Sequence, residues 1–115
     1  MQYIIRRADI EDIPDLVRLR RIMFEDMGLG TKESNDLSDE NTRKQLEGMI
    51  PNADLIGWVV IQEGRIIVSG AILFDQHLPS PLNPTGWIAY ILNVAVEEPY
   101  QQKGIATHIM VIILN

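Results

Sequence analysis

The spacing of apolar residues changes halfway along the chain, from a helical period to the near-continuous runs typical of buried strands. In the first half, apolar side chains recur every three or four positions and predict a helix with one buried face. The members of this face are Ile13, Leu16, Leu19, Met23 and Met27. We expect Asp12 to cap this helix and Gly28 to end it. A short strand over residues 3–7 should precede it, and a second helix should run from Ser38 to about Ile50.

Three strands are predicted in the second half. They cover residues 55–62, 66–74 and 87–96. Glu63-Gly64 separates the first two strands and predicts a hairpin turn. Because both runs are almost entirely apolar, we expect both faces of the sheet to be covered. Residues 75–86 contain three prolines and predict an irregular loop, and a third helix is expected from Ile105 onward. The order β-α-α-β-β-β-α predicts an α+β domain with an antiparallel hairpin at its centre.

Composition and charge narrow the class of protein. The chain has 115 residues, of which 46% are hydrophobic and 23% charged, a balance that supports the core of one domain. The net charge is −6 and no run of Lys or Arg exceeds two residues, so no nucleic-acid partner is expected. No apolar run approaches the roughly 18 residues of a membrane span, and the N-terminus does not resemble a signal peptide. We therefore expect a cytoplasmic protein without a membrane partner.

The residues that commonly carry metals or covalent chemistry are scarce. The chain has no cysteine, which excludes disulfides, thiolate metal sites and a cysteine nucleophile. His77 and His108 lack the spacing of a metal site such as His-x-x-x-His, so no metal is expected. Gly28-Leu29-Gly30 follows a predicted helix rather than a strand, which argues against a dinucleotide fingerprint.

The stretch LNVAVEEPYQQKGIATHIM, residues 92–110, is the strongest candidate for a binding site. After a strand, the backbone amides of residues 101–107 can point into one concavity, and a following helix adds its N-terminal amides and positive dipole end. Gly104 has no Cβ and lets a phosphate approach the backbone, Ala106 is small, and Lys103 adds a positive charge. These features are typical of a loop that holds a diphosphate. A strand, a turn and a helix with one glycine is also a common plain connection.

This stretch resembles the acetyl-CoA motif of the GNAT superfamily of N-acetyltransferases. The family pattern is Gln or Arg, two residues, Gly, one residue, then Gly or Ala, and Gln101-x-x-Gly104-x-Ala106 is similar to it. The predicted element order is also the family's N-terminal order, and HLPSPLNPTGWIAYILN is similar to a proline-rich loop in a bacterial subgroup. The resemblance implies a GNAT-like mixed, mainly antiparallel sheet flanked by helices. It also implies that residues 1–115 form a single domain equivalent to the N-terminal two-thirds of a full family domain, without its C-terminal β-α-β elements.

The resemblance assigns binding roles to two segments. In the family, the fourth strand separates from its neighbour at a bulge, and its free backbone groups pair with the pantetheine arm of the cofactor. This implies that Val94, Ala95 and Val96 line the pantetheine and the thioester. It also implies that the pyrophosphate is cradled by Gln102, Lys103, Gly104, Ile105, Ala106 and Thr107.

The implied function is acyl-CoA-dependent N-acetyl transfer. A primary amine of a small-molecule or peptide acceptor would attack acetyl-CoA, the co-substrate, directly. A backbone amide near Val94 is a candidate for polarising the thioester carbonyl. Glu25 and Asp26 are candidate bases, although a solvated helix end explains both residues better. Tyr90 and Asn93 lie closer to the expected site, but a strand tyrosine is more often a packing residue. The catalytic residues therefore stay unknown.

A second hypothesis is a truncated, catalytically inactive family member that binds CoA weakly or not at all and self-associates. The third predicted helix carries an apolar stripe at Ile105, Ile109, Ile112 and Ile113. An exposed apolar stripe favours contact with a partner, and an unpaired edge of the fourth strand can accept a strand from another copy. Both features predict a homodimer or a higher oligomer.

Overall fold

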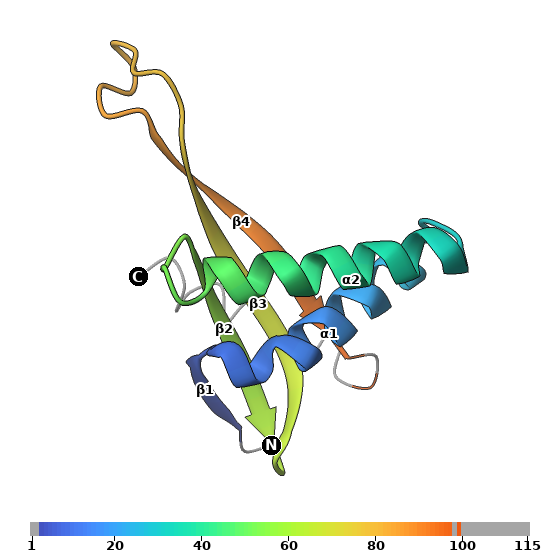
Figure 1. Cartoon of the computed structure of the whole chain (residues 1–115). Coiled ribbons are helices and arrows are strands. Elements are labelled where there is room, and N and C mark those ends of the chain that lie inside the picture. The colour runs from blue at the N-terminus through green and yellow to red at the C-terminus, as the bar shows by residue number, and fades with distance from the viewer. Residues whose placement is uncertain (1–2, 98, 100–115) are drawn as a thin grey trace.

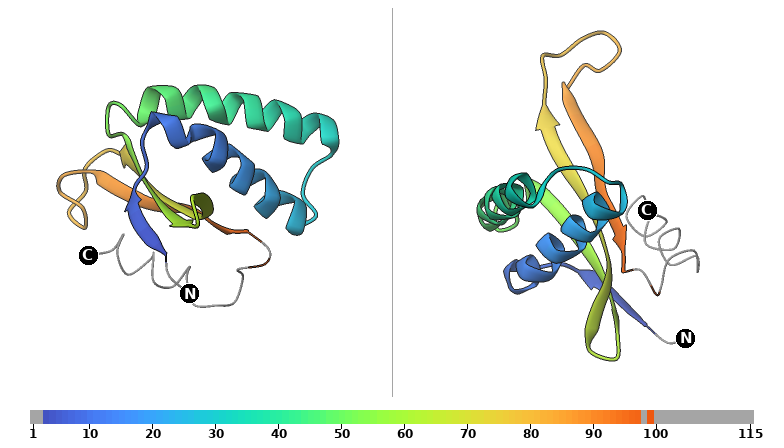
Figure 2. Two further views of the ribbon diagram at one scale, coloured as in Figure 1. Left: turned by 90° about the horizontal axis from the view of Figure 1, so that it is seen from below. Right: turned by 90° about the vertical axis from the view of Figure 1, so that its right-hand side faces the viewer.

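The computed structural model describes residues 3–97 and 99, in which two long helices pack on a four-stranded sheet (Figure 1). The described elements are β1 (Ile4–Arg7), the 3₁₀ helix η1 (Ile10–Asp12), α1 (Ile13–Asp26), α2 (Lys32–Met49), β2 (Leu55–Gln62), β3 (Arg65–Gln76) and β4 (Trp87–Val96). The sheet order is β1-β2-β3-β4, and each neighbouring pair is antiparallel. Figure 2 shows α1 and α2 side by side on one face of the sheet. The predicted α+β fold is confirmed, while the helix expected from Ile105 lies outside the described residues.

The start of α1 differs from the prediction that Asp12 caps it. Asp9 begins the preceding 3₁₀ helix, where its carboxylate accepts a hydrogen bond from the Glu11 amide at 2.9 Å. Asp12 stands at the N-cap position of α1 but makes no side-chain cap bond. Its two oxygens instead accept bonds of 2.7 and 2.8 Å from the Arg6 guanidinium. This bidentate pair fixes the end of β1 against the start of α1.

The predicted start of α2 at Ser38 is wrong, because the helix already begins at Lys32. Thr31 and Ser34 form a reciprocal capping box. The Thr31 hydroxyl accepts from the Ser34 amide at 3.1 Å, and the Ser34 hydroxyl accepts from the Thr31 amide at 2.8 Å. Gly28, at φ 70°, follows the last turn of α1 as predicted. The loop between the helices is therefore much shorter than the polar composition indicates.

The central hairpin confirms the predicted turn. Glu63 and Gly64 have φ values of 51° and 76°, the left-handed conformations that a type I′ turn requires at both central positions. One irregularity lies farther along the same pair: Val60 pairs with Val68 and Ile61 with Ile66, which leaves Ile67 as an extra residue in β3. Ile67 is completely buried, so this bulge belongs to the core.

Apolar side chains are buried on both faces of the sheet, as predicted. On the face that carries the helices, the buried cluster includes Ile13, Leu16, Leu19, Leu46, Leu55 and Val59. On the opposite face, Val60, Ile67 and Val68 have no exposed surface. Met27, expected in the apolar stripe of α1, is instead exposed where that helix ends. Among the described helices, none is long and apolar enough to cross a membrane.

Candidate functional site

A bulge in β4 marks the edge of the sheet. Ser69 pairs with Ala95, and Ala71 pairs with Leu92, so Gly70 alone stands opposite the two residues 93 and 94. The extra residue is therefore in β4, where it bends the strand and takes backbone groups out of the ladder. β4 is also the last strand in the described sheet. The bulge expected from the family resemblance is confirmed, at Asn93 and Val94.

The three strand residues of the predicted cofactor site begin within this bulge, at Val94, and alternate between the faces of the sheet. Ala95 is buried in the cluster beneath the helices. Val94 and Val96 pack with the cluster on the opposite face. Next to the bulge, β4 therefore contributes side chains to the buried clusters on both faces of the sheet. The six residues of the predicted diphosphate loop, 102–107, lie outside the described residues.

One backbone hydrogen bond and two ion pairs hold the end of β4. The Glu97 amide donates to the Ile67 carbonyl at 2.8 Å. Its carboxylate, whose side chain is 15% exposed, accepts from Arg65 at 2.8 Å and from Arg18 at 3.2 Å. The hydrogen bond from Arg65, reinforced by that from Arg18, holds the pKa of Glu97 below its ordinary value. The chain thus leaves β4 from an anchored point.

Two small cavities lie beside the bulge, on the face that carries the helices. Their volumes are about 20 and 90 Å³, and they share the lining residues Arg20, Thr42, Leu46 and Leu55. The smaller cavity reaches Gly70, opposite the bulge, and the larger reaches Leu92, which precedes it. The residues that line the two cavities therefore come from α1, α2, β2, β3 and β4, and the cavities lie next to the bulge of β4.

Arg20 supplies the positive charge of these cavities. Its guanidinium carbon lies 4.7 Å from the centre of the Phe24 ring, one turn farther along α1. Burial lowers the pKa of Arg20 from its ordinary value. An arginine starts from a value so high that it still carries its charge near neutral pH. Arg20 was not among the residues predicted for the site, although its position four residues after Leu16 places it beside the buried face of the helix.

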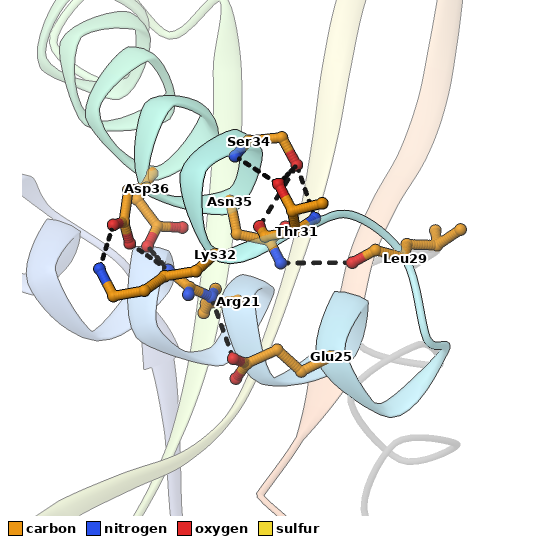
Figure 3. A network of polar contacts seen from close by, with 9 residues as sticks. Arg21, Glu25, Leu29, Thr31, Lys32, Ser34, Asn35 and Asp36 are labelled. Atoms are coloured by element: carbon orange, nitrogen blue, oxygen red, sulfur yellow. Dashed lines mark hydrogen bonds and ion pairs between the residues drawn. The ribbon is translucent and has the colours of Figure 1, made fainter.

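A separate and larger cavity, of about 500 Å³, lies at the loop between α1 and α2. Figure 3 shows the polar contacts among residues of this region. Arg21 lines this cavity and pairs with Asp39 at 2.7 Å, Asp36 at 3.0 Å and Glu25 at 3.2 Å. The hydrogen bonds that Arg21 donates to these carboxylates, that to Asp39 foremost, raise the pKa of Arg21. The candidate base Glu25 is thus held by a cation and half-exposed, which agrees with a solvated helix end. Asp26, next to it, is also exposed.

The candidate Tyr90 is directed toward the hairpin loop. Its hydroxyl lies 3.2 Å from Nε2 of His77, and the same nitrogen lies 3.2 Å from a carboxylate oxygen of Asp75. All three side chains are exposed on the hairpin of β3 and β4, which projects beyond the helices (Figure 1). Asn93, the other strand candidate, is one of the two bulge residues. Within the described part of the chain, no group of three acidic or histidine side chains could hold a metal.

Comparison with known proteins gives a consistent result. Residues 16–113 match the model of the family described as "Acetyltransferase (GNAT) family". No curated protein matches the chain. A solved structure from Clostridium acetobutylicum, described as a predicted acetyltransferase with acetyl-CoA, is 28% identical with a TM-score of 0.90, over 99% of this chain and 72% of that one.

Two more distant structures share the fold. A GCN5-related N-acetyltransferase from Ralstonia eutropha is 22% identical, with a TM-score of 0.86 over 96% of this chain and 72% of that chain. Glucosamine-6-phosphate N-acetyltransferase from Arabidopsis thaliana is 18% identical, with a TM-score of 0.68 over 99% of this chain and 73% of that chain. This chain therefore shares its architecture of helices over an antiparallel sheet with all three solved structures.

Proposed function

This chain belongs to the GNAT family of acetyltransferases, and from that premise we propose that it transfers an acetyl group from acetyl-CoA to a primary amine. The observation that carries the proposal is the bulge at Asn93 and Val94, on a strand at the edge of the described sheet. An edge strand with backbone groups outside the ladder can bind an extended ligand as a further strand would. The pantetheine arm is such a ligand.

The proposed reaction is direct transfer in a ternary complex. The amine nitrogen attacks the thioester carbonyl, the carbon–sulfur bond breaks, and the CoA thiolate takes up a proton as the amine loses one. A backbone amide near Val94 would polarise the carbonyl, while Ala95 and Val96 line the pantetheine. The loop of residues 102–107 would bind the diphosphate through its backbone amides. Because the chain has no cysteine, the acetyl group has no cysteine thiol to rest on.

The proposal treats residues 1–115 as one GNAT-like domain. The family match over residues 16–113 supports this, as does the alignment of 99% of the chain with the structure from Clostridium acetobutylicum. The acceptor would be a small-molecule or peptide amine, and the reaction would need no metal. Its general acid and general base remain unassigned, since Glu25 is paired and Tyr90 contacts the hairpin loop.

A thermal melt with and without acetyl-CoA tests the proposal. A ligand at a hundredfold excess over its dissociation constant adds about 2.7 kcal/mol to the free energy of unfolding, which raises the Tm of a small domain by several degrees. We expect this shift in the wild type and its loss in Gly104→Glu, because an acidic side chain would oppose the diphosphate. The matched control is Gly48→Glu on α2, where an added Cβ meets nothing within 4 Å. This control should retain the shift.

The other outcomes test whether acetyl-CoA binds at all and whether its diphosphate binds at the loop of residues 102–107. A shift in the wild type and both variants would place the diphosphate elsewhere. If acetyl-CoA shifts none of the folded proteins, the proposed function is wrong.

A second candidate function is self-association without catalysis, favoured by the position of β4 at the edge of the described sheet. Such an edge can pair with the same strand of another copy. Leu78 and Leu82 in the hairpin loop, both more than nine-tenths exposed, add apolar surface near this edge. Sedimentation velocity at several protein concentrations tests it, since a monomer throughout would exclude this candidate.

A further inference from the structure

The two cavities beside the β4 bulge share one wall, and their surfaces are mainly apolar. The larger cavity is lined chiefly by long apolar side chains, those of Leu46, Met49, Leu55, Leu73 and Leu92. Three polar residues, Arg20, Thr42 and Gln45, complete this lining. No acidic side chain is among the described residues that line either cavity, so these walls offer no charge partner to a protonated amine. The lining therefore suits an apolar group better than it suits the amine acceptor.

Small residues stand at the end of the cavities that is nearest the bulge. Ser69, Gly70 and Ala71 of β3 line the smaller cavity. Ser69 pairs with Ala95, just after the bulge, and Gly70 stands opposite the bulge itself. Because these side chains are short, they leave room beside β4 at the point where the thioester carbonyl is expected. A chain attached to that carbonyl can therefore extend from the bulge into the cavities.

The volumes of the cavities limit the length of such a chain. A water molecule has a share of about 30 Å³ in the liquid, and a methylene group is of similar size. The smaller cavity, at about 20 Å³, thus has room for one carbon atom, and the larger, at about 90 Å³, for about three more. An acetyl group has a single carbon beyond the carbonyl, so it would leave the larger cavity empty. A linear chain with about four carbons beyond the carbonyl would fill both.

We propose that these cavities hold the acyl chain of the cofactor, and that the protein transfers short linear acyl groups of about three to five carbons as well as acetyl. The inference rests on the proposed acetyl transfer, whose acyl donor it broadens. The bonds that change are the same for every chain length. The carbon–sulfur bond of the thioester breaks, a carbon–nitrogen bond to the amine forms, and the CoA thiolate takes up a proton as the amine loses one.

A series of acyl-CoA esters of increasing chain length tests this assignment. Acetyl-, propionyl-, butyryl-, pentanoyl-, hexanoyl- and octanoyl-CoA are titrated into the full chain by calorimetry, and transfer to a panel of primary amines is followed by the release of free thiol. Burial of one methylene group increases affinity about fourfold, so we expect butyryl-CoA to bind up to about 15-fold more tightly than acetyl-CoA. The affinity should stop rising after pentanoyl-CoA, where the cavities are full. An affinity that rises steadily to octanoyl-CoA would contradict a pocket of this size.

Variants of the larger cavity locate the chain. Leu73→Phe adds volume at a residue that lines this cavity alone, so it should bring the affinities for butyryl- and acetyl-CoA close together while acetyl-CoA still binds. The matched control is Leu37→Phe on α2, which makes the same substitution at a 63% exposed residue and should keep the preference for butyryl-CoA. Met49→Ala enlarges the cavity and should move the end of the rise to hexanoyl-CoA. This variant serves as the test if Leu73→Phe fails to fold.

The remaining outcomes distinguish this inference from the proposed function. If amines are acetylated but butyryl-CoA neither binds more tightly nor reacts faster than acetyl-CoA, acetyl transfer stands and the acyl pocket is wrong. Loss of the preference in both Leu73→Phe and Leu37→Phe would likewise overturn the assignment to these cavities. If no acyl group is transferred, a preference for butyryl-CoA that is lost in Leu73→Phe and kept in Leu37→Phe would preserve the pocket while the proposed reaction fails. If none of the esters binds, both proposals are wrong.

Discussion

The two edges of the described sheet are built in opposite ways. β1 is a strand of 4 residues that ends in Arg6 and Arg7, and its end is clamped to the start of α1 by the Asp12 carboxylate. β4 is a strand of 10 residues with a bulge, and its clamp at Glu97 lies beyond the strand's last residue. Short, charged edges are a known protection against unwanted strand addition. β1 is therefore protected against further pairing, and the longer, bulged β4 is the edge that we propose for the ligand.

The two clamping carboxylates differ in their surroundings. The Asp12 side chain is 6% exposed and also accepts the amide hydrogen of Asp9. That of Glu97 is 15% exposed, and one of its partners, Arg65, is largely in solvent. We call the Arg6–Asp12 pair the β1 clamp, and the pairs of Glu97 with Arg18 and Arg65 the β4 clamp. We expect the β1 clamp to contribute more to stability and the β4 clamp to contribute more to cofactor binding.

Asp12→Ala should have the largest effect on stability. It removes two bonds from Arg6 and one from the Asp9 amide, and we expect the free energy of unfolding to fall by about 2–4 kcal/mol. Asp15→Ala, in the first turn of α1 and with a 42% exposed side chain, should cost less than about 1 kcal/mol. Urea denaturation measures both values. Equal losses would show that the β1 clamp is an ordinary surface ion pair.

Glu97→Gln should cost less stability, about 1–2 kcal/mol, because the acceptor of the bonds from Arg18 and Arg65 loses its negative charge. It should also weaken acetyl-CoA binding severalfold, since the chain leaves β4 here toward the predicted diphosphate loop. Calorimetric titration of the folded variant with acetyl-CoA measures this. If Asp12→Ala weakens binding as much as Glu97→Gln does, the functional difference between the edges is wrong.

Acid should weaken the two clamps in sequence. The ion pairs lower the pKa of both carboxyls, from ordinary values of 3.8 for Asp12 and 4.5 for Glu97. A lowered pKa means that each contribution is complete above the ordinary value and is lost as the pH falls through the folded-state value. We expect the stability difference between wild type and Glu97→Gln to shrink below pH 4.5, before that for Asp12→Ala. Urea midpoints across this pH range would show the order, and simultaneous loss would contradict it.

Arg65→Met should have the smallest effect. Its side chain is 59% exposed, and solvent screens its bond to Glu97, so we expect a loss of about 1 kcal/mol or less. Arg18→Met should cost more, because Arg18 is more buried and also donates to the Ile66 carbonyl at 2.8 Å. The same urea measurement compares the two, and a larger loss for Arg65→Met would assign the clamp to the exposed partner.

The strands could be predicted from the sequence better than the helices could. β2 and β4 have the predicted bounds, because their apolar runs end sharply at the Glu63-Gly64 turn and at the proline-rich loop. The start of α2 was missed because its first turns are polar and Leu37 is exposed, so no apolar period marks them. The Thr31-x-x-Ser34 capping box was the available signal, with serine in the place that glutamate more often takes.

The candidate site depended on different kinds of information. The bulge at Asn93 and Val94 has no pattern in the residues themselves, and only the family resemblance indicated it. The Arg20 cavities could not be predicted at all, because their walls come from segments far apart in the sequence that meet only in the folded domain. A run such as Arg18-Leu19-Arg20-Arg21 looks like a solvated helix face until its neighbours in space are known.

The order of the strands also has a consequence for folding kinetics. β2, β3 and β4 pair with their neighbours in sequence, whereas β1 reaches β2 only across the whole of α1 and α2. Contacts between nearby residues form early because they close short loops, while a pairing across two helices must wait for a large loss of chain entropy. We therefore expect β1 and its Arg6–Asp12 clamp to join after the transition state, so that weakening this clamp mainly speeds unfolding. The edge proposed for the ligand would then take shape first, and the closed edge last.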